Sequence, residues 1–183
     1  PVPDEILAFG HSLGSITLHL GMILDSGAYA DRAFASGTGG NIAYYVLETG
    51  LLGSGNDVVD LLDDFVDADL PEDPTGSEAV GALLGVPEEG WPRVDAMHPA
   101  FLLFQTLMDP ADPIALAAEQ PVPAHILMGV GDRQVPNVTT GWLAEALPDA
   151  THSDCDALSD YDPHICMFME DEGLDALSTW LRE

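Results

Sequence analysis

The sequence predicts an α/β fold in which helices flank a parallel sheet. The apolar run at 6–10 indicates a strand, and residues 13–24 directly after it carry apolar side chains at helical spacing. A second short, buried strand is predicted at 32–36 and another at 125–130. Because long stretches of chain separate these strands, we expect them to pair in parallel.

The junction between the first strand and the first helix carries a G-x-S-x-G sequence, Gly10-His11-Ser12-Leu13-Gly14. A serine on so tight a turn has a strained backbone that directs its hydroxyl away from the sheet, and small flanking residues permit that conformation. We therefore predict that Ser12 is a nucleophile and that the Leu13 N–H stabilises an oxyanion. The alternative is a glycine-flanked serine in an ordinary turn.

A carboxylate follows the strand at 125–130. Asp132 comes directly after Gly131, which places it at the carboxyl end of a parallel strand and on the same edge of the sheet as Ser12. A carboxylate in that position can orient an imidazole and support its positive charge. The alternative for Asp132 is a turn or capping aspartate.

A serine hydroxyl needs a base, and the chain contains six histidines. Four of them lie in the turn, on the following helix, in the central region or at the start of a strand: His11, His19, His98 and His125. The remaining two, His152 and His164, both follow Asp132 in the chain. We prefer His164 because it lies on a loop just before the terminal helix, from which it can reach the sheet edge, and His152 remains the alternative.

Ser12, Asp132 and His164, in this chain order, resemble the catalytic triad of the α/β-hydrolase fold, and the resemblance runs from Ile6 to Leu181. In that fold several strands precede the nucleophile, whereas only eleven residues precede Ser12 here. We therefore expect a partial α/β-hydrolase fold, the C-terminal portion, with an upstream half that supplies neighbouring strands and a second oxyanion N–H. Without that half, the isolated segment is expected to be a poor enzyme.

A narrower resemblance rests on three segments, which are the motif from Gly10 to Gly14 and the stretches 105–113 and 131–137. These segments are similar to bacterial extracellular lipases of the virulence-factor group. This resemblance implies a lipase- or esterase-like carboxylester hydrolase that acts through an acyl-enzyme on a small-molecule ester or lipid. It also implies secretion or a cell-surface location, and neither a metal nor an organic cofactor. Alternatives are acyl transfer on the same fold, or a noncatalytic secreted binding protein.

The interval 38–123 is too long for an ordinary connection between strands. We expect it to be a helical cap or lid insertion, which leaves 1–37 as the nucleophile part of the core and 124–183 as the part with the acid and the histidine. Within the cap, alternating aspartates and apolar pairs at 57–67 predict an amphipathic helix. A calcium loop is not predicted, because the aspartates do not have the spacing of calcium ligands in such a loop. The apolar segment 101–108 lines an acyl pocket or forms the core of the cap.

Acidic residues outnumber basic residues 32 to 4, which gives a formal net charge of −28. Such a charge repels polyanions, so nucleic acids and anionic membrane surfaces are not expected as partners. Neutral and cationic substrates remain compatible with it. No apolar run in the sequence reaches the length that a transmembrane helix needs.

Two cysteines, Cys155 and Cys166, flank an aspartate-rich loop. In an exported protein we expect them to form a disulfide, and two isolated buried thiols are the alternative. Around this loop, a helix is predicted at 137–147, with Asn137 as its capping residue, and a terminal helix at 171–182. The apolar stripe of the terminal helix is expected to pack on the sheet.

Overall fold

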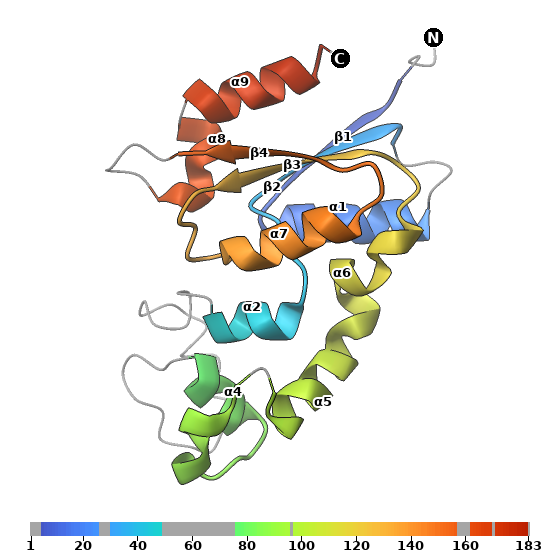
Figure 1. Ribbon diagram of the computed structural model, residues 1–183. Coiled ribbons are helices and arrows are strands. Elements are labelled where there is room, and N and C mark those ends of the chain that lie inside the picture. The colour runs from blue at the N-terminus through green and yellow to red at the C-terminus, as the bar shows by residue number, and fades with distance from the viewer. Residues whose placement is uncertain are drawn as a thin grey trace. The chain divides into compact units, whose positions relative to one another are not determined.

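The structure is a computed structural model that describes residues 5–25, 30–48, 76–95, 97–156, 162–169 and 171–182 (Figure 1). The chain divides into two units, which are Pro1–Asn41 with Pro110–Glu183, and Ile42–Asp109. The second unit falls inside the interval 38–123 for which the sequence predicts an insertion. Each unit is described separately below.

A four-stranded sheet forms the centre of the first unit, and its strands pair in parallel, as the sequence predicts (Figure 1). The strands lie in chain order, and their bounds are β1 Leu7–His11, β2 Arg32–Ser36, β3 Ala124–Gly129 and β4 Thr151–Cys155. Three of the four had been predicted to within one residue at each end. Because the strands are parallel, their carboxyl ends, and the loops that follow them, gather at one edge of the sheet.

The strand β4 is not among the strands that the sequence predicts. Its residues, Thr-His-Ser-Asp-Cys, are polar except for the last, and only Cys155 is buried. Within the described residues β4 pairs with β3 alone, at the edge of the sheet. An edge strand with one solvated side needs no apolar alternation, so no hydrophobic pattern marks it in the sequence.

Helices cover both faces of this sheet. The helices α1 Leu13–Leu24 and α7 Asn137–Ala146 pack on one face, and α8 Cys166–Met169 and α9 Asp171–Trp180 pack on the other (Figure 1). Each face has its own apolar cluster: one is built around Leu18, Met22, Ile126 and Leu143, and the other around Phe34, Leu127, Met167 and Trp180. The first unit also contains the short helices α6 Pro113–Leu116, η3 Ala117–Glu119 and η4 Pro163–Ile165.

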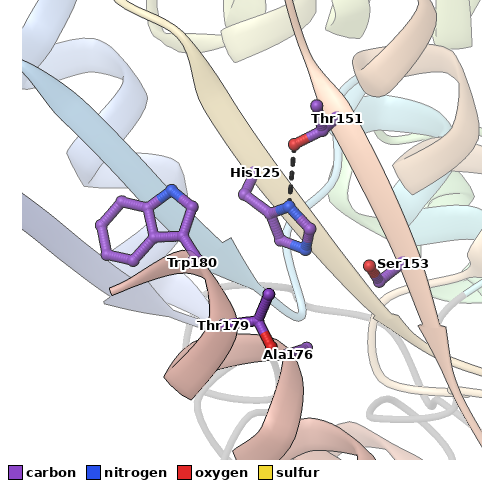
Figure 2. Close-up of a pocket in the computed structure, with 6 residues that line it drawn as sticks. All are labelled: His125, Thr151, Ser153, Ala176, Thr179 and Trp180. Carbon is purple, nitrogen blue, oxygen red and sulfur yellow. Dashed lines mark hydrogen bonds between the residues drawn. The ribbon is translucent and has the colours of Figure 1, made fainter. Parts of the chain in front are cut away.

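The terminal helix packs on the sheet over a narrower stripe than the sequence predicts. Trp180 is buried and Leu177 packs against the same cluster, but Leu174 and Leu181 are about half exposed. Beside Trp180 a hollow of about 320 Å³ lies between α9 and the first residues of β3 and β4 (Figure 2). It is lined by His125, Thr151, Ser153, Ala176, Thr179 and Trp180, none of which is a predicted catalytic residue.

The second unit is helical in its described part, with α2 Ile42–Glu48, α4 Gly76–Leu83, η1 Glu88–Arg93, α5 Pro99–Met108, and the start of the short helix η2 Asp109–Ala111. Its buried side chains include Val80, Trp91 and Phe101, and the Trp91 indole N–H donates a 2.7 Å hydrogen bond to the Val86 carbonyl. On α5, Phe101 is therefore core, whereas Leu102, Leu103 and Leu107 are exposed. The acidic helix predicted at 57–67 lies outside the described residues.

A buried histidine makes the stability of the first unit sensitive to acid. The side chain of His19, on α1, is fully buried, and its Nδ1 lies 2.7 Å from Oε1 of Gln120. Burial lowers the pKa of His19 below 6.5, and the hydrogen bond to Gln120 opposes this shift only in part. In the unfolded chain His19 therefore binds a proton at a higher pH than in the native chain.

We expect the free energy of unfolding to be unaffected by His19 above about pH 6.5 and to fall below that pH, by up to about 1.4 kcal/mol per pH unit. Urea unfolding of the wild type and of His19→Gln, at several pH values between 8 and 5, measures this slope. The variant should lose stability at pH 8 but show a shallower decline toward pH 5. Parallel declines in the two proteins would show that His19 is not the group responsible.

Candidate active site

Ser12 occupies a strained turn between β1 and α1. Its backbone has φ 54° and ψ −130°, a combination that costs a non-glycine residue about 1–3 kcal/mol. Hydrogen bonds on both sides hold the turn: the Ser12 N–H donates to the Ser36 carbonyl at 2.9 Å, and the Ser12 carbonyl accepts from the N–H groups of Ser15 and Ile16. The neighbouring elements therefore support the strain, and the half-buried Ser12 lies at the carboxyl edge of the sheet.

Leu13 is the first residue of α1, so its N–H has no acceptor within the helix. The N-terminus of a helix carries a partial positive charge that favours a developing anion. The Leu13 N–H is therefore free of a helical acceptor and lies at the positive end of α1, which suits one of the donors to an oxyanion.

The two glycines of the motif are not equivalent. A Cβ added at Gly10 would lie 2.7 Å from the Gly14 carbonyl oxygen and 2.7 Å from the Ser15 Cα, both in the backbone. A Cβ added at Gly14 would meet nothing within 4 Å. Gly10 is required for the close approach of strand and helix, whereas the steric reason expected from the sequence does not apply to Gly14.

This difference predicts opposite outcomes for two single-methyl substitutions. Gly10→Ala should lower the free energy of unfolding by about 1–3 kcal/mol, because backbone atoms must move to admit the methyl group. Gly14→Ala should be neutral or stabilising by up to about 1 kcal/mol, since alanine is the better helix former. Thermal or urea unfolding of both variants and of the wild type measures these two changes. Equal losses of unfolding free energy in the two variants would contradict the close approach at Gly10.

Asp132 lies in the loop after β3, and its two carboxylate oxygens have separate partners. Oδ1 accepts hydrogen bonds from the N–H groups of Gln134, at 2.8 Å, and Val135, at 3.0 Å. Oδ2 lies 2.8 Å from Nδ1 of His164. The Asp132 side chain is 2% exposed, so this loop holds it as a preoriented acceptor for one imidazole nitrogen.

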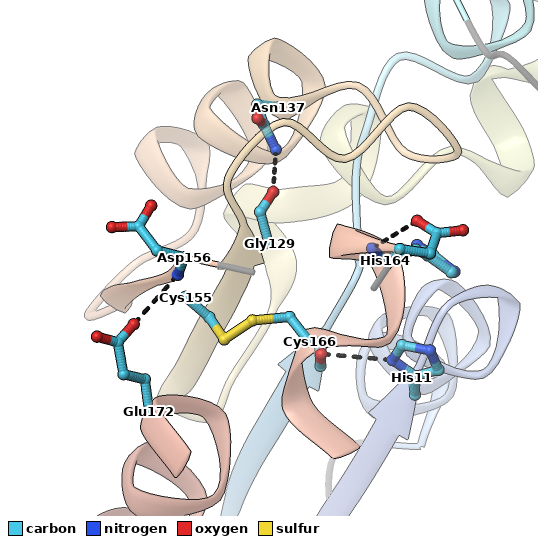
Figure 3. Close-up of a disulfide and its surroundings, with 10 residues drawn as sticks. His11, Gly129, Asn137, Cys155, Asp156, His164, Cys166 and Glu172 are labelled. Atoms are coloured by element: carbon cyan, nitrogen blue, oxygen red, sulfur yellow. Dashed lines mark hydrogen bonds between the residues drawn. A yellow bond between two sulfur atoms is a disulfide. The ribbon is translucent and has the colours of Figure 1, made fainter. Parts of the chain in front are cut away.

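Asn137 stabilises this loop and does not cap α7, contrary to the prediction. The residue before the helix is Pro136, and it has no side-chain capping bond. The Asn137 side chain donates a 2.7 Å hydrogen bond to the Gly129 carbonyl (Figure 3). It also accepts a 2.7 Å hydrogen bond from the Gly131 N–H. Asn137 therefore ties the end of β3 to the turn that presents Asp132.

His164 lies in the short helix η4, and its ring is 6% exposed. The Asp162 carboxylate caps this helix by accepting a 3.0 Å hydrogen bond from the His164 N–H. Because an ionised Asp132 can only accept, the imidazole nitrogen that faces it must carry the proton, which leaves Nε2 as the basic nitrogen. This tautomer is the one that a general base for a serine hydroxyl requires.

Gly37, directly after β2, connects the surroundings of Ser12 and His164. The Ser12 N–H bonds to the carbonyl of Ser36, the residue before Gly37, and a Cβ added at Gly37 would lie 2.9 Å from Cε1 of His164. Gly37 also has φ +54°, which L side chains rarely adopt. No feature of the sequence marks Gly37 as part of the site. Among the described residues no hydrogen bond joins the Ser12 hydroxyl to His164, and such bonds often tighten only in a substrate complex.

The alternative base, His152, has different surroundings. It lies on β4, is partly exposed, and its Nε2 is 3.3 Å from an oxygen of Asp154 on the same strand. Asp132 is hydrogen-bonded to His164 instead. The geometry therefore favours His164 as the partner of Asp132.

A disulfide joins Cys155 to Cys166, and the expected pairing is confirmed (Figure 3). Cys155 ends β4, Cys166 begins α8, both are buried, and their Cα atoms are 6.3 Å apart. Because Cys166 follows His164 by two residues, the disulfide attaches the segment that carries the imidazole to the sheet.

No group of three or more metal-ligating side chains occurs in the part of the chain that the structure describes. In the same part, no helix is both long and apolar enough to cross a membrane.

No family model matches the chain, and no curated protein sequence matches it either. Solved structures do resemble it. A bromoperoxidase from Bacillus anthracis has 14% identity and a TM-score of 0.52, over 97% of this chain and 67% of that one. A hydrolase from Oleispira antarctica has 12% identity and a TM-score of 0.53, over 98% and 66%. A thermophilic esterase has 19% identity and a TM-score of 0.52, over 99% and 67%.

The chain therefore has an α/β-hydrolase fold, as the sequence predicts, and spans about two thirds of the length of these structures. Identities this low establish the fold alone. The narrower resemblance to extracellular lipases of the virulence-factor group stays a prediction.

Proposed function

We propose that this chain is the part of a serine hydrolase that carries the nucleophile, the acid and the base, and that it cleaves carboxylic esters through an acyl-enzyme. The observation that carries the proposal is the buried hydrogen bond between Asp132 and His164 at the sheet edge where Ser12 occupies its strained turn. A buried carboxylate–imidazole pair beside such a serine is the arrangement that nucleophilic acyl transfer needs.

In the proposed reaction the Ser12 hydroxyl attacks the ester carbonyl while Nε2 of His164 takes its proton. Asp132 stabilises the imidazolium, and the Leu13 N–H stabilises the negative oxygen of the tetrahedral intermediate. The imidazolium returns the proton to the leaving alcohol, and the acyl group remains on Ser12. Water then attacks the acyl-enzyme with His164 again as the base, which releases the acid and restores the serine.

The surroundings of the site support a small ester or lipid as the substrate. Leu13, Phe168 and Met169 expose apolar surface, from elements that directly adjoin Ser12 and His164. Such side chains suit an acyl chain better than a charged group. The net charge of −28 disfavours anionic substrates. Two of the similar structures, an esterase and a hydrolase, agree with this substrate class.

Two further parts of the proposal concern the whole protein. The buried disulfide supports an oxidising compartment, and hence secretion or a cell-surface location. At the other side of the sheet, β1 has one neighbour among the described strands, and Ile6 and Phe9 are 43% and 47% exposed. An upstream half that covers this apolar edge and contributes the second oxyanion N–H fits these observations.

Hydrolysis of p-nitrophenyl esters of increasing acyl length by the full-length protein tests the proposal. We expect a burst of p-nitrophenol equal to the enzyme concentration when deacylation is slow, and loss of turnover in Ser12→Ala. Addition of a second alcohol distinguishes acyl transfer, in which a new ester replaces the free acid. If Ser12→Ala hydrolyses the esters as fast as the wild type, an acyl-enzyme on Ser12 is excluded. If the wild type itself hydrolyses none of them, a noncatalytic binding protein is favoured.

A further inference from the structure

The imidazole of His11 packs directly against the imidazole of the proposed base. The ring centroids of His11 and His164 are 4.9 Å apart with a 45° tilt, and the ring of Phe168 meets His11 edge-on at the same centroid distance. His11 is the last residue of β1 and directly precedes Ser12, so its side chain adjoins the turn that presents the nucleophile. None of the steps proposed above uses it.

His11 is held from the neighbouring strand. It is paired with Ser36 in the parallel register of β1 and β2, and its Nδ1 lies 3.3 Å from the buried Ser36 hydroxyl oxygen. The two imidazoles approach each other beside Gly37, where a Cβ would lie 2.9 Å from Cε1 of His164 and 3.4 Å from Cε1 of His11. The absence of a side chain at Gly37 leaves the space in which both rings fit.

A single hydrogen bond to Asp132 fixes one nitrogen of His164 but does not fix the plane of the ring. The His11 ring contacts His164 from the end of β1, next to Ser12, so it restricts that rotation. We propose that His11 is a positioning residue that holds the His164 imidazole in the orientation in which Nε2 faces Ser12. This inference rests on the proposed function.

The charge state of His11 agrees with this role. Burial lowers the pKa of His11, the nearby His164 lowers it further, and Asp132 opposes both by raising it. Near neutral pH the His11 ring is therefore uncharged and does not repel the imidazolium that forms on His164 during the reaction. Among the described residues, the titratable and polar groups that face His11 are His164 and Ser36, the ring of Phe168 packs against it, and the Asp132 carboxylate raises its pKa.

The first test separates positioning from substrate binding. His11→Ala should lower kcat for ester hydrolysis by roughly 10–100-fold with KM unchanged, since a misplacement of about 1 Å in a catalytic group costs about that much. His11→Phe, which keeps a planar aromatic ring at this position, should restore kcat to within a few-fold of the wild type. His125→Ala is the matched control, because it also removes a packed imidazole, one stacked on Phe34, but lies outside the site.

The second test does not depend on turnover. The Nδ1 proton of His164, hydrogen-bonded to Asp132, should give a low-field proton NMR signal that is identified by its loss in His164→Ala. It should broaden or vanish in His11→Ala and persist in His11→Phe and His125→Ala. If the full-length protein hydrolyses no ester, the proposed function fails, while this signal still reports whether His11 holds the ring.

Unchanged kcat and an unchanged signal in His11→Ala would overturn the inference. A loss of kcat in His11→Phe as large as in His11→Ala, with the signal intact in both, would also overturn it, because the ring shape would then not be what matters. If His11→Ala fails to fold by circular dichroism, Phe168→Ala provides the second variant. Loss of the edge-on contact with His11 should broaden the His164 signal, and an unchanged signal would count against the inference.

Discussion

Replacement of His164 by alanine is expected to lower kcat for ester hydrolysis by about three to six orders of magnitude while the protein stays folded. His164 is the imidazole bonded to the buried Asp132, and in the proposed reaction it is the base that takes the Ser12 proton. The matched control is His152→Ala, on the exposed edge strand β4, which should retain kcat within a few-fold.

Steady-state kinetics with a short-chain p-nitrophenyl ester measures kcat of His164→Ala and His152→Ala. Circular dichroism shows whether each variant is folded. Retained activity in His164→Ala combined with a loss in His152→Ala would transfer the role of base to His152. Equal losses in the two variants, with both folded, would contradict the assignment of a single base.

Removal of the disulfide is the second change with a large expected effect. Replacing Cys155 and Cys166 together by alanine should lower the free energy of unfolding by about 2–3 kcal/mol, as the chain-entropy model gives for so short a loop. Activity should fall as well, mainly through kcat, because Cys166 attaches the His164 segment to the end of β4. Urea unfolding and ester kinetics of the double variant measure the two effects.

Intact-mass analysis after alkylation, with and without prior reduction, provides the control. The wild type should show two thiols that alkylate only after reduction. Two free thiols in protein isolated from an oxidising compartment, or a double variant as stable and active as the wild type, would contradict this role of the disulfide.

The elements that are rich in apolar residues could be predicted from the sequence. The strands β1, β2 and β3 and the helix α1 are marked by apolar runs whose length and spacing suit their environment. The strand β4 could not be found in the same way, since its polar residues lie on the solvated edge of the sheet. The misassignment of Asn137 has a related cause: a polar residue before a helix suits a cap, and only the folded loop shows that its amide bonds to Gly129 and Gly131 instead.

In the candidate site, too, some residues can be predicted from the sequence and others are recognised only in the folded structure. The sequence predicts Ser12 and Asp132 as site residues because each follows a predicted strand, and His164 because it lies before the terminal helix. The contact between His11 and His164 has no sequence signal, since 153 positions separate the two residues and the approach depends on the register that pairs His11 with Ser36. The role of Gly37 likewise appears only when both imidazoles are in place.

Covalent labelling of Ser12 tests the central claim most directly. A fluorophosphonate probe reacts with a serine whose proton is removed by a neighbouring base, and mass spectrometry of the digested full-length protein identifies the modified residue. We expect one adduct per chain, on Ser12, with none in Ser12→Ala and much slower labelling in His164→Ala. Absence of labelling in the folded wild type, or an adduct on another serine that persists in Ser12→Ala, would contradict the assignment of Ser12 as the nucleophile.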